Sequence, residues 1–394
     1  MARSPSLAEL RRFAIARSLF KPVTLPAAIR RLGFVQADPM RAPARAQDLI
    51  LRMRVRDYRA GDLERRYERL DIEEDAFVNY GFVSRDMLSL LHPRTPRRPW
   101  DATTARRAQE VLAFVQEWGV VHPREVSEAF GHHGRVAGYW GGELNASTRL
   151  LDAMHHHGWL RVCRRESGTR VYAPVAHPEQ DVSPAARLAR AEALVDRIVA
   201  LYAPLPAPSL GYLVTLLRYG APQLAAEARA VAKAAPSRYG HAVVDGTTWF
   251  WPVAESPASR RHQPDNGVRL LAPFDPVVWD RRRFEMLWGW AYRFEAYVPA
   301  PKRTMGHYAL PVLWGEQMVG WANLRMERGM VHRCFHLRPG AASETVEGIR
   351  ALAVDKDHAP KWNPARIEDV TPEMVAPFFA SPWPAHSHPL AALA

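Results

Sequence analysis

Cysteine is almost absent from this sequence of 394 residues, which contains only Cys163 and Cys334. The two lie far apart, and neither belongs to a Cys-x-x-Cys pair. The sequence therefore gives no indication of a disulfide framework or of a cysteine zinc site. We expect both thiols to be chemically inert.

Long apolar runs are missing as well. No window approaches the ~20 apolar residues of a membrane-spanning helix, and residues 1–10 lack the apolar stretch of a signal peptide. The sequence also contains no P-loop, dinucleotide-binding fingerprint or nucleophile elbow. These absences predict a cytoplasmic protein and argue against nucleotide-driven or α/β-hydrolase chemistry.

Positive charge is in excess. Lys and Arg number 53 against 41 Asp and Glu, which gives a formal net charge of +12. Such a balance favours a polyanionic partner, either nucleic acid or an acidic membrane surface. The alternative is a compositional bias of a GC-rich genome, because nearly all the cations are Arg and the chain is also rich in Ala and Pro.

Apolar residues at helical spacing predict the first elements. Ser6 is a candidate cap for the first helix, Gly33 ends the second, and Pro39 disfavours helical geometry at Asp38. The expected order is a helix over 6–20, a helix over 25–32, an extended segment over 34–38 and a helix over 44–55. This order is typical of a helix-turn-helix relative.

The same kind of pattern begins again twice. The second unit has predicted helices over 105–118, 125–130 and 145–157, followed by strands over 159–164 and 169–172. The third has helices over 184–202, 210–219 and 223–233, followed by a hairpin over 242–251 that turns at Asp245-Gly246. A hairpin that follows a helix in this way is typical of the wing of a winged-helix domain.

Strands predominate after residue 267. They are expected at 268–271, 292–298, 306–314, 318–326 and 330–337, and they predict a small antiparallel barrel or sandwich followed by a helix over 343–353. The tail from about residue 381 is expected to be mobile. The predicted fold class is α+β: three winged-helix units over 1–100, 101–180 and 181–256, a C-terminal β-barrel over 257–360, and a tail over 361–394.

Several motifs carry a resemblance to a known family. They are Gly33-Phe-Val-Gln-Ala-Asp-Pro39, Ala44-Arg-Ala-Gln-Asp-Leu49, Leu270-Leu-Ala-Pro-Phe-Asp-Pro-Val-Val-Trp-Asp-Arg281, Tyr292-Arg-Phe-Glu295, Tyr297-Val-Pro-Ala-Pro-Lys-Arg303 and Gly306-His-Tyr308. In this collinear order, over about residues 5–360, the chain resembles the winged-helix DNA glycosylase family of the YcaQ and AlkZ type. Two departures stand out: Gln47 replaces a more usual His, and residues 79–83, which include Phe82, replace a Trp-Ala-His-type stretch.

The resemblance implies tandem winged helices on a C-terminal barrel and the excision of N7-alkylated purines, including the unhooking of interstrand crosslinks. It implies a catalytic Gln-x-Asp triplet, which here falls on Gln36 and Asp38. In an extended segment residues i and i+2 face the same side, so both side chains would enter one site. Without the resemblance, the simpler interpretation is a turn-capping Asp38 and a surface Gln36.

The chemistry suits one carboxylate. Breaking an N-glycosidic bond builds positive charge on the sugar, which a fixed Asp38 carboxylate would stabilise while it accepts a proton from water. Gln36 would orient that water. An N7-alkylated purine already carries a positive charge and leaves as a neutral base, so no general acid is required.

Arginine clusters suggest where phosphates are bound. The predicted DNA contacts are Arg45, Arg52, Arg161, Arg164, Arg165, Arg170, Lys302 and Arg303. For the run over 45–59 the alternative is an ordinary solvated face neutralised by Asp48, Asp57, Asp62 and Glu64. Lys302 and Arg303 would contact DNA from a barrel loop or only hold that loop in place.

Histidines 155–157, with His132 and His133, suggest a metal site, but successive helical positions point about 100° apart and do not converge on one ion. We therefore expect no metal and no cofactor. Trp288, Trp290, Trp314 and Trp321 are interpreted as barrel core or packing anchors, with base stacking as the alternative.

The sequence thus predicts a monomeric, monofunctional DNA glycosylase, associated with the nucleoid in the cytoplasm, whose partner is duplex DNA containing alkylated purines. The rival is a non-catalytic winged-helix DNA-binding protein or regulator. Catalysis on RNA or free nucleosides is a third interpretation, which arrayed winged helices disfavour. An accessible Gln-x-Asp pair in a basic concavity would favour the enzyme, and a pair packed under other side chains would favour the rival.

Overall fold

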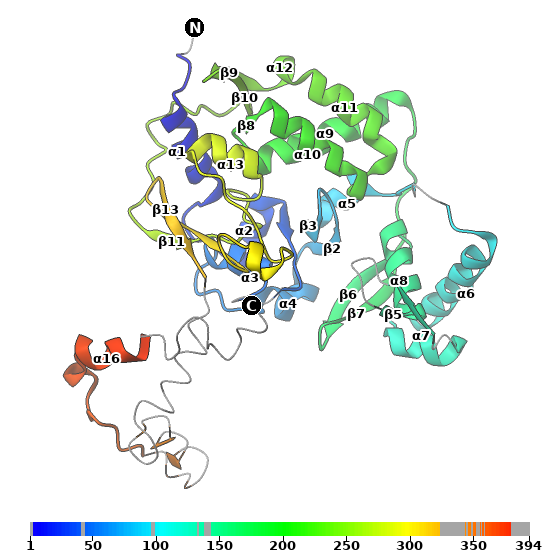
Figure 1. Ribbon diagram of the computed structural model, residues 1–394. Helices are drawn as coiled ribbons and strands as arrows, with labels where there is room; N and C mark the ends of the chain where they lie inside the picture. Colours follow the sequence, from blue (N-terminus) through cyan, green and yellow to red (C-terminus); the bar gives the residue numbers. More distant parts are fainter. Residues whose placement is uncertain are drawn as a thin grey trace. The chain divides into compact units, whose positions relative to one another are not determined.

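The structure, a computed structural model, describes residues 3–40, 44–95, 99–131, 134–137, 143–323, 343, 346–347, 350–351, 355, 357 and 359–379. The chain forms two compact units. One comprises Met1–Arg293 with Leu310–Gly320, and the other comprises Phe294–Ala309 with Trp321–Ala394. The described residues form a mixed α+β fold (Figure 1).

The N-terminal segment holds the Gln-x-Asp triplet in a small sheet. Its elements are α1 (Leu7–Ser18), α2 (Leu25–Leu32), β1 (Phe34–Gln36), α3 (Ala46–Arg52), α4 (Asp62–Arg66), the 3-10 turn η1 (Tyr67–Arg69), β2 (Ile72–Ala76) and β3 (Tyr80–Ser84). The sheet order is β1-β3-β2 and both pairings are antiparallel. Ser6 and Glu9 form a capping box at α1, and Gly33 ends α2 in the left-handed region, as the sequence predicts.

The middle segment follows the prediction with a few additions. It contains η2 (Arg85–Met87), α5 (Leu88–Leu91), α6 (Ala102–Trp118), α7 (Pro123–Phe130), the short strands β4 (Arg135–Ala137) and β5 (Glu143–Asn145), α8 (Ala146–His157), β6 (Leu160–Glu166) and β7 (Thr169–Pro174). Strands β6 and β7 form the expected hairpin, which turns at Ser167 and Gly168 in positive φ. A single bridge joins Val121 to Tyr172 on the other side of β7.

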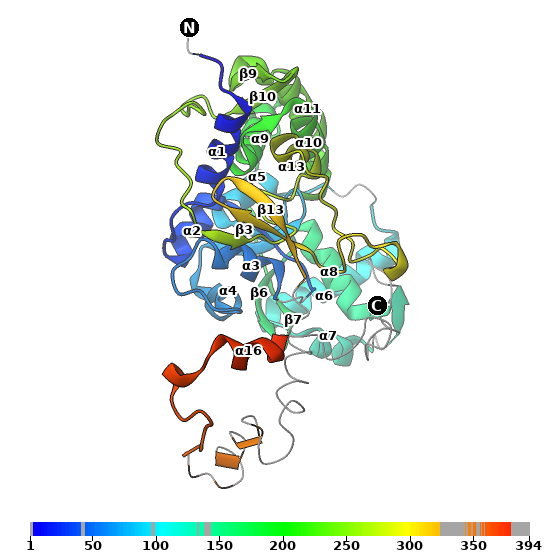
Figure 2. The same ribbon diagram turned by 60° about the vertical axis from the view of Figure 1, so that its left-hand side comes forward.

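The third segment repeats helices followed by a hairpin. It contains α9 (Pro184–Tyr202), β8 (Leu205–Pro206), α10 (Ala207–Gly220), η3 (Pro222–Leu224), α11 (Ala225–Lys233), α12 (Ala235–Arg238), β9 (Gly240–Val244) and β10 (Thr247–Trp251), with strand order β8-β10-β9. Helices α9, α10 and α11 pack side by side, as both ribbon views show (Figures 1 and 2). The hairpin turns at Asp245-Gly246, both at positive φ, as predicted.

Two apolar cores stabilise these segments. The larger core joins α1, α2 and the first sheet to α9, α10 and β10, and it also includes Ala272 and Leu287. The smaller core, built around Val111, Leu151 and Tyr172, belongs to the middle segment alone. The first and third segments therefore share one core, although about 100 residues of sequence separate them.

The C-terminal prediction is only partly correct. Strands β11 (Val268–Leu270), β12 (Leu310–Trp314) and β13 (Gln317–Ala322) form a three-stranded sheet, and α13 (Arg281–Trp288) is a helix that the sequence interpretation missed. No closed barrel exists among the described residues. The predicted strand over 292–298 is wrong, because local bonds such as Val298 N to Glu295 O (3.0 Å) make turns there.

The remaining C-terminal predictions have mixed outcomes. Trp314 and Trp321 are about half exposed and are not core residues. The expected strand over 330–337 and the tail from 381 lie outside the described residues, as does most of the expected helix over 343–353. The described part of the predicted tail contains η7 (Ile367–Asp369) and α16 (Pro372–Phe379), and the loop before β12 contains η4 (Ala300–Lys302).

Candidate active site and nucleic-acid interface

The Gln-x-Asp triplet begins at Gln36, the last residue of the edge strand β1 of the first sheet, and continues past the end of that strand. Gln36 is paired with Gly81 of β3, and the Ala37 N–H donates to the Tyr80 carbonyl at 3.1 Å. A Cβ on Gly81 would overlap the Val35 carbonyl oxygen and lie 2.6 Å from the Phe34 ring. Glycine at this position therefore permits the close approach of β1 and β3 that sets the triplet in place.

Asp38 lies just beyond the end of β1 and is half-buried. Its Oδ1 accepts a hydrogen bond from the Met40 N–H at 2.9 Å. Burial raises the pKa of this carboxyl above its ordinary value, and the bond from Met40 opposes that rise. A partly desolvated carboxylate whose second oxygen has no bond to any described residue is suited to stabilising a cation and to accepting a proton.

Gln36 is more deeply buried than a surface strand residue would be. The residue is 5% exposed, and its Oε1 has no hydrogen-bond partner among the described residues. A buried acceptor of this kind is normally satisfied by an ordered water or a ligand. The triplet thus combines a buried amide with a half-buried carboxylate. An accessible pair would favour the enzyme and a covered pair the non-catalytic DNA-binding protein, and this pair is neither fully accessible nor fully covered.

Two of the predicted DNA contacts lie at the ends of α3: Arg45 precedes its first residue and Arg52 is its last. Arg45 pairs with Glu64 of α4 (Nη1 to Oε1, 2.8 Å), and Gln47 donates to the same oxygen at 2.9 Å. The exposed Arg52 donates from Nη1 to the Tyr58 carbonyl at 2.7 Å. Asp48 does not belong to a solvated face: it is buried and accepts from the Tyr58 hydroxyl.

Arg54, in the same arginine run, is fully buried. It makes a two-pronged pair with Asp275 (2.8 and 3.0 Å) and donates to the carbonyls of Ser18 and Ile50. The exposed fraction of both charged side chains is 0%. Asp275 belongs to the Leu270–Arg281 motif, so this part of the motif holds the end of α3 in place.

The arginines of the β6–β7 hairpin form ion pairs within the chain. Arg161 pairs with Glu73 (2.6 Å) and Arg165 with Glu74 (2.6 Å), two nearly buried carboxylates of β2. Arg170 pairs with Asp152 at 2.6 Å. The more exposed Arg164 pairs with Glu166 of its own hairpin. Sequence reasoning missed Glu73 and Glu74 because both partners lie about 90 residues away along the chain.

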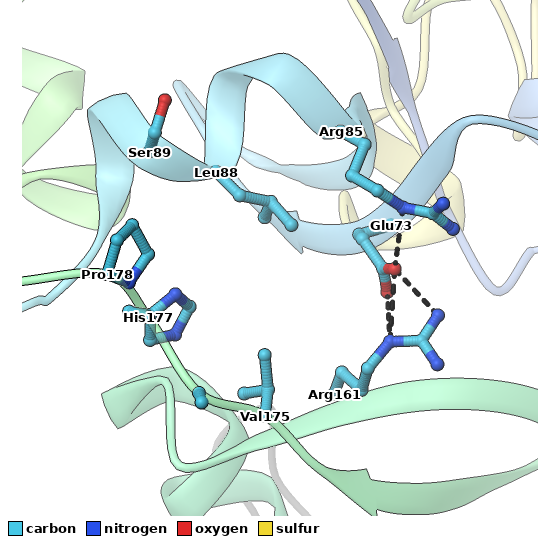
Figure 3. A pocket seen from close by; sticks show the side chains of 9 residues that line it. Glu73, Arg85, Leu88, Ser89, Arg161, Val175, His177 and Pro178 are labelled. Atoms are coloured by element: carbon cyan, nitrogen blue, oxygen red, sulfur yellow. Dashed lines mark hydrogen bonds and ion pairs between the residues drawn. The ribbon is translucent and has the colours of Figure 1, made fainter.

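A pocket of about 460 Å³ opens beside one of these pairs (Figure 3). Arg85 and Arg161 lie at one end with Glu73 between them, and Leu88, Val175 and His177 line the other end. Arg85 donates from Nε to Glu73 at 3.3 Å. None of the residues that line this pocket belongs to the Gln-x-Asp triplet, so the pocket and the triplet are separate features.

A buried polar cluster lies at the other edge of the first sheet. Asp75 accepts from His92 (2.6 Å) and Arg94 (3.0 Å), and the His92 ring stacks on His177. Burial alone would raise the pKa of Asp75, but the Arg94 guanidinium and His92 hold it well below its usual range. Burial lowers the pKa of His92 despite its bond to Asp75. The charges of this cluster are paired with one another, and Arg94 also donates to the carbonyls of His156 and Gly220, which joins β2 to α8 and α10.

The histidines of α8 do not converge. His155 is buried and contacts the Leu160 carbonyl through Nδ1 (3.1 Å), while His157 stacks on Trp100. Burial lowers the pKa of His156 to about 4. His132 and His133 lie outside the described residues, within which no group of three or more His, Cys, Asp or Glu could hold a metal ion.

Lys302 and Arg303 belong to the second compact unit. Lys302 is exposed, whereas Arg303 donates from Nε to the Val298 carbonyl at 2.7 Å. Glu295 accepts the backbone N–H groups of Thr304 and Met305 in the same loop. Arg303 therefore helps to hold the loop in shape, as one of the two sequence interpretations expects. Over the part of the chain that the structure describes, no helix is both long and apolar enough to cross a membrane.

Comparisons with known proteins identify the family to which the chain belongs. Short segments match curated relatives: a probable 3-hydroxyisobutyryl-CoA hydrolase 2 of Arabidopsis thaliana (46% identity over 46 residues, 12% of each chain) and the small ribosomal subunit protein mS47 of the same plant (64% over 33 residues, 8% of each). The chain spans about an eighth or less of these proteins. Among solved structures, the DNA glycosylase AlkZ of Streptomyces sahachiroi matches with 14% identity and a TM-score of 0.49, over 90% of this chain and 98% of that one.

The family model described as DNA glycosylase AlkZ-like matches residues 29–355. That range includes the Gln-x-Asp triplet, the paired arginines of the hairpin and the motif around Asp275. The chain therefore belongs to the AlkZ-like family of DNA glycosylases.

Proposed function

We propose that this protein is a monofunctional DNA glycosylase that hydrolyses the N-glycosidic bond of cationic alkylated purines in duplex DNA. Asp38 would stabilise the positive charge that develops on the sugar and accept a proton from the attacking water. Gln36 would hold that water through its buried Oε1, which has no partner among the described residues. The observation that carries the proposal is Asp38 itself, a half-buried carboxylate within the range that the family model matches, at the position that the resemblance implies to be catalytic.

Substrate charge follows from the surroundings of Asp38. Among the described residues, burial and the Met40 N–H are what shift the pKa of Asp38, and no second titratable side chain of that part of the chain acts on it. A site with one carboxylate lacks the general acid that a neutral leaving base needs. We therefore infer N7-alkylguanine and N3-alkyladenine as substrates, with bulky N7 adducts and interstrand crosslinks as the larger members of the same class.

Duplex DNA as the substrate is supported by strand order. The sheets β1-β3-β2 and β8-β10-β9 each place the second strand of a hairpin between its partner and an earlier strand. The bridge from Val121 to Tyr172 gives the β6–β7 hairpin the same order. Because helices precede each hairpin, we interpret the three segments as tandem winged-helix units, a type that binds DNA in its grooves.

Phosphate contacts would come from the cations that remain exposed. Among the predicted contacts, Arg52 and Lys302 are exposed and Arg164 is partly exposed. Arg56, Arg59 and Arg69 are also exposed, and their side chains make no hydrogen bond or ion pair with any residue that the structure describes. We propose that these six side chains bind the DNA backbone, while Arg161, Arg165 and Arg170 position the hairpin.

The test is excision from a duplex that carries one N7-methylguanine, followed by alkaline cleavage of the abasic site. Asp38→Asn should lose at least ~100-fold in single-turnover rate and keep duplex binding. Gln36→Ala should lose less, because water partly replaces an amide that orients water. The matched control is Asp57→Asn, which removes an exposed carboxylate at a positive φ that Asn tolerates.

Three results would count against the proposal. Equal excision by wild type and Asp38→Asn would reject Asp38 as the catalytic group. Tight duplex binding without excision of any cationic or neutral lesion would instead support the non-catalytic DNA-binding rival. Efficient release of uracil or 8-oxoguanine would require a general acid that the site does not provide.

A further inference from the structure

The pocket beside Glu73 is formed where the first and middle segments meet (Figure 3). One wall comes from β2, η2 and α5, with Glu73, Arg85 and Leu88, and the other comes from β6 and residues 175–178, with Arg161. Its volume of about 460 Å³ falls within the range of small-molecule sites, roughly 300–1,000 Å³. The pocket shares no residue with the Gln-x-Asp triplet, so the glycosidic chemistry proposed above does not account for it.

Two guanidinium groups and one carboxylate meet at one end of this pocket. Arg161 is bound to Glu73 Oε1 through Nε at 3.0 Å and Nη2 at 2.6 Å, so these two charges neutralise each other. Arg85 is held more loosely, because its Nε lies 3.3 Å from Glu73. Its Nη2 lies 3.5 Å from the Leu70 carbonyl and its Nη1 3.6 Å from Asp71. All three distances exceed the roughly 2.7–3.2 Å of an ordinary N–H···O bond, so the Arg85 charge is available to a ligand.

Arg161 also keeps an unused donor. Its Nη1 makes no hydrogen bond to any residue that the structure describes, and 31% of the side chain is exposed. A carboxylate ligand would bring one charge to these groups. A phosphate monoester brings nearly two at neutral pH and three acceptor oxygens, enough to bind Arg85 and Arg161 while Glu73 keeps its pair. The charges at this end therefore favour a phosphate over a carboxylate.

Apolar side chains line much of the remaining surface. Leu88 and Val175 face each other from opposite walls, and Ala176 and Pro178 also line the pocket (Figure 3). A flat apolar group between these walls would be covered on both faces, while a phosphate attached to it reaches the guanidinium groups. The pocket thus joins an apolar part to a cationic end, as small-molecule sites commonly do.

Both walls are held in place by bonds within the chain. The His177 ring stacks on His92 with 4.5 Å between the ring centroids, and its Nε2 contacts the Gly158 carbonyl at 2.9 Å. Gln180 donates from Nε2 to the Ser89 carbonyl at 3.2 Å, which ties the chain after β7 to α5. A ligand would therefore order few groups when it binds, and this lowers the entropic cost of binding.

We propose that this pocket is a binding site for a phosphate monoester carried by a flat, largely apolar body, the chemistry of a mononucleotide. The phosphate binds Arg85 and the Nη1 of Arg161, and the apolar body lies between Leu88 and Val175. Because the two walls belong to different segments, the bound ligand stabilises the joint between the first and middle segments. A 5′-phosphate at the end of a DNA strand has the same chemistry, and the experiment distinguishes the two sources.

Isothermal titration calorimetry on the full chain compares phenyl phosphate, inorganic phosphate, adenosine 5′-monophosphate and a short single-stranded oligonucleotide with a 5′-phosphate. Phenyl phosphate should bind at least ~10-fold more tightly than inorganic phosphate, because only phenyl phosphate fills the apolar part. Arg85→Ala should weaken the binding of both about 10-fold, since it removes a charge-assisted contact. Ala176→Phe fills the apolar part from an exposed position and should weaken the binding of phenyl phosphate alone.

The matched control is Arg106→Ala, which removes an exposed arginine whose ion pair with Glu110 is similarly long, at 3.8 Å. It should leave the affinity for every ligand unchanged. If phenyl phosphate binds no more tightly than inorganic phosphate, or if Arg85→Ala binds it as tightly as wild type does, the inference is overturned.

The two larger ligands identify the source of the phosphate. Binding of adenosine 5′-monophosphate that is weakened in Arg85→Ala supports a free nucleotide as the ligand. Binding of the oligonucleotide alone, weakened in the same variant, supports the same site with a DNA end as its ligand. None of these titrations requires excision, so their outcome is independent of whether Asp38 is catalytic.

Discussion

Replacing Asp275 by Asn would leave the Arg54 guanidinium without its counter-ion in a place that excludes water. Breaking a buried ion pair by removing one partner costs roughly 3–5 kcal/mol. Arg54 keeps its bonds to the Ser18 and Ile50 carbonyls, both at 2.7 Å, and Asn keeps an oxygen for the Val277 N–H. We therefore expect a loss near the lower end, about 3 kcal/mol in free energy of unfolding.

Urea unfolding followed by circular dichroism measures this loss as a lower midpoint at an unchanged m value. The matched control is Asp62→Asn, which breaks the exposed pair with Arg65 and should cost less than ~1 kcal/mol. A double variant, Arg54→Met with Asp275→Asn, should lose less than the sum of the two single changes, because no unpaired charge remains buried. A midpoint for Asp275→Asn as close to wild type as that of the control would refute the reasoning.

Three further predictions concern stability and binding. Asp38→Asn should raise the free energy of unfolding near neutral pH, because burial raises the pKa of Asp38 and so disfavours its charge in the folded state. In urea melts this gain should vanish at pH values below the ordinary pKa of Asp, and a gain that stayed constant with pH would contradict the prediction. Arg56→Ala and Arg69→Ala should each reduce the log–log salt slope of duplex binding by about one, whereas Arg165→Ala, whose guanidinium is paired with Glu74, should lower stability and leave the slope unchanged. Gly81→Ala should unfold the first sheet and abolish excision, whereas Gly211→Ala, at an open position in α10, should stabilise the protein by about 0.5–1 kcal/mol. Equal melting temperatures for the two variants would show that β1 and β3 do not approach each other closely.

Local patterns predicted many of the helices because capping residues and apolar spacing are local features, although α4, α5, α12 and α13 were missed. Helix α2 begins and ends at the predicted residues since Gly33 stops it, and α9 does so with Pro184 at its start. Strand β2 was missed: Ile72-Glu-Glu-Asp-Ala76 looks polar, yet every residue in it is buried. Its carboxylates are covered by arginines from β6 and by Arg94, contacts that no local pattern reveals.

The site shows the same division. The triplet was found through resemblance, and the extended geometry of Gln36 follows from its neighbours. The burial of Gln36 depends on β3, which lies more than 40 residues later and whose pairing with β1 fixes the register. Likewise, the sequence alone does not show that Glu73 and Glu74 of β2 lie beside the β6–β7 hairpin, so it predicted that Arg161 and Arg165 would bind phosphates.

The two carboxylates of β2 also determine how the chain can be divided. The boundary expected near residue 100 would separate Glu73 and Glu74 from Arg161 and Arg165, and each half would then expose to water a charge whose partner had been removed. The shared apolar core of the first and third segments would be cut open as well. Limited proteolysis should therefore nick the loops between segments without releasing an independently folded N-terminal piece, and recombinant fragments that end near residue 100 should be recovered only as aggregates or in association with the remainder of the chain.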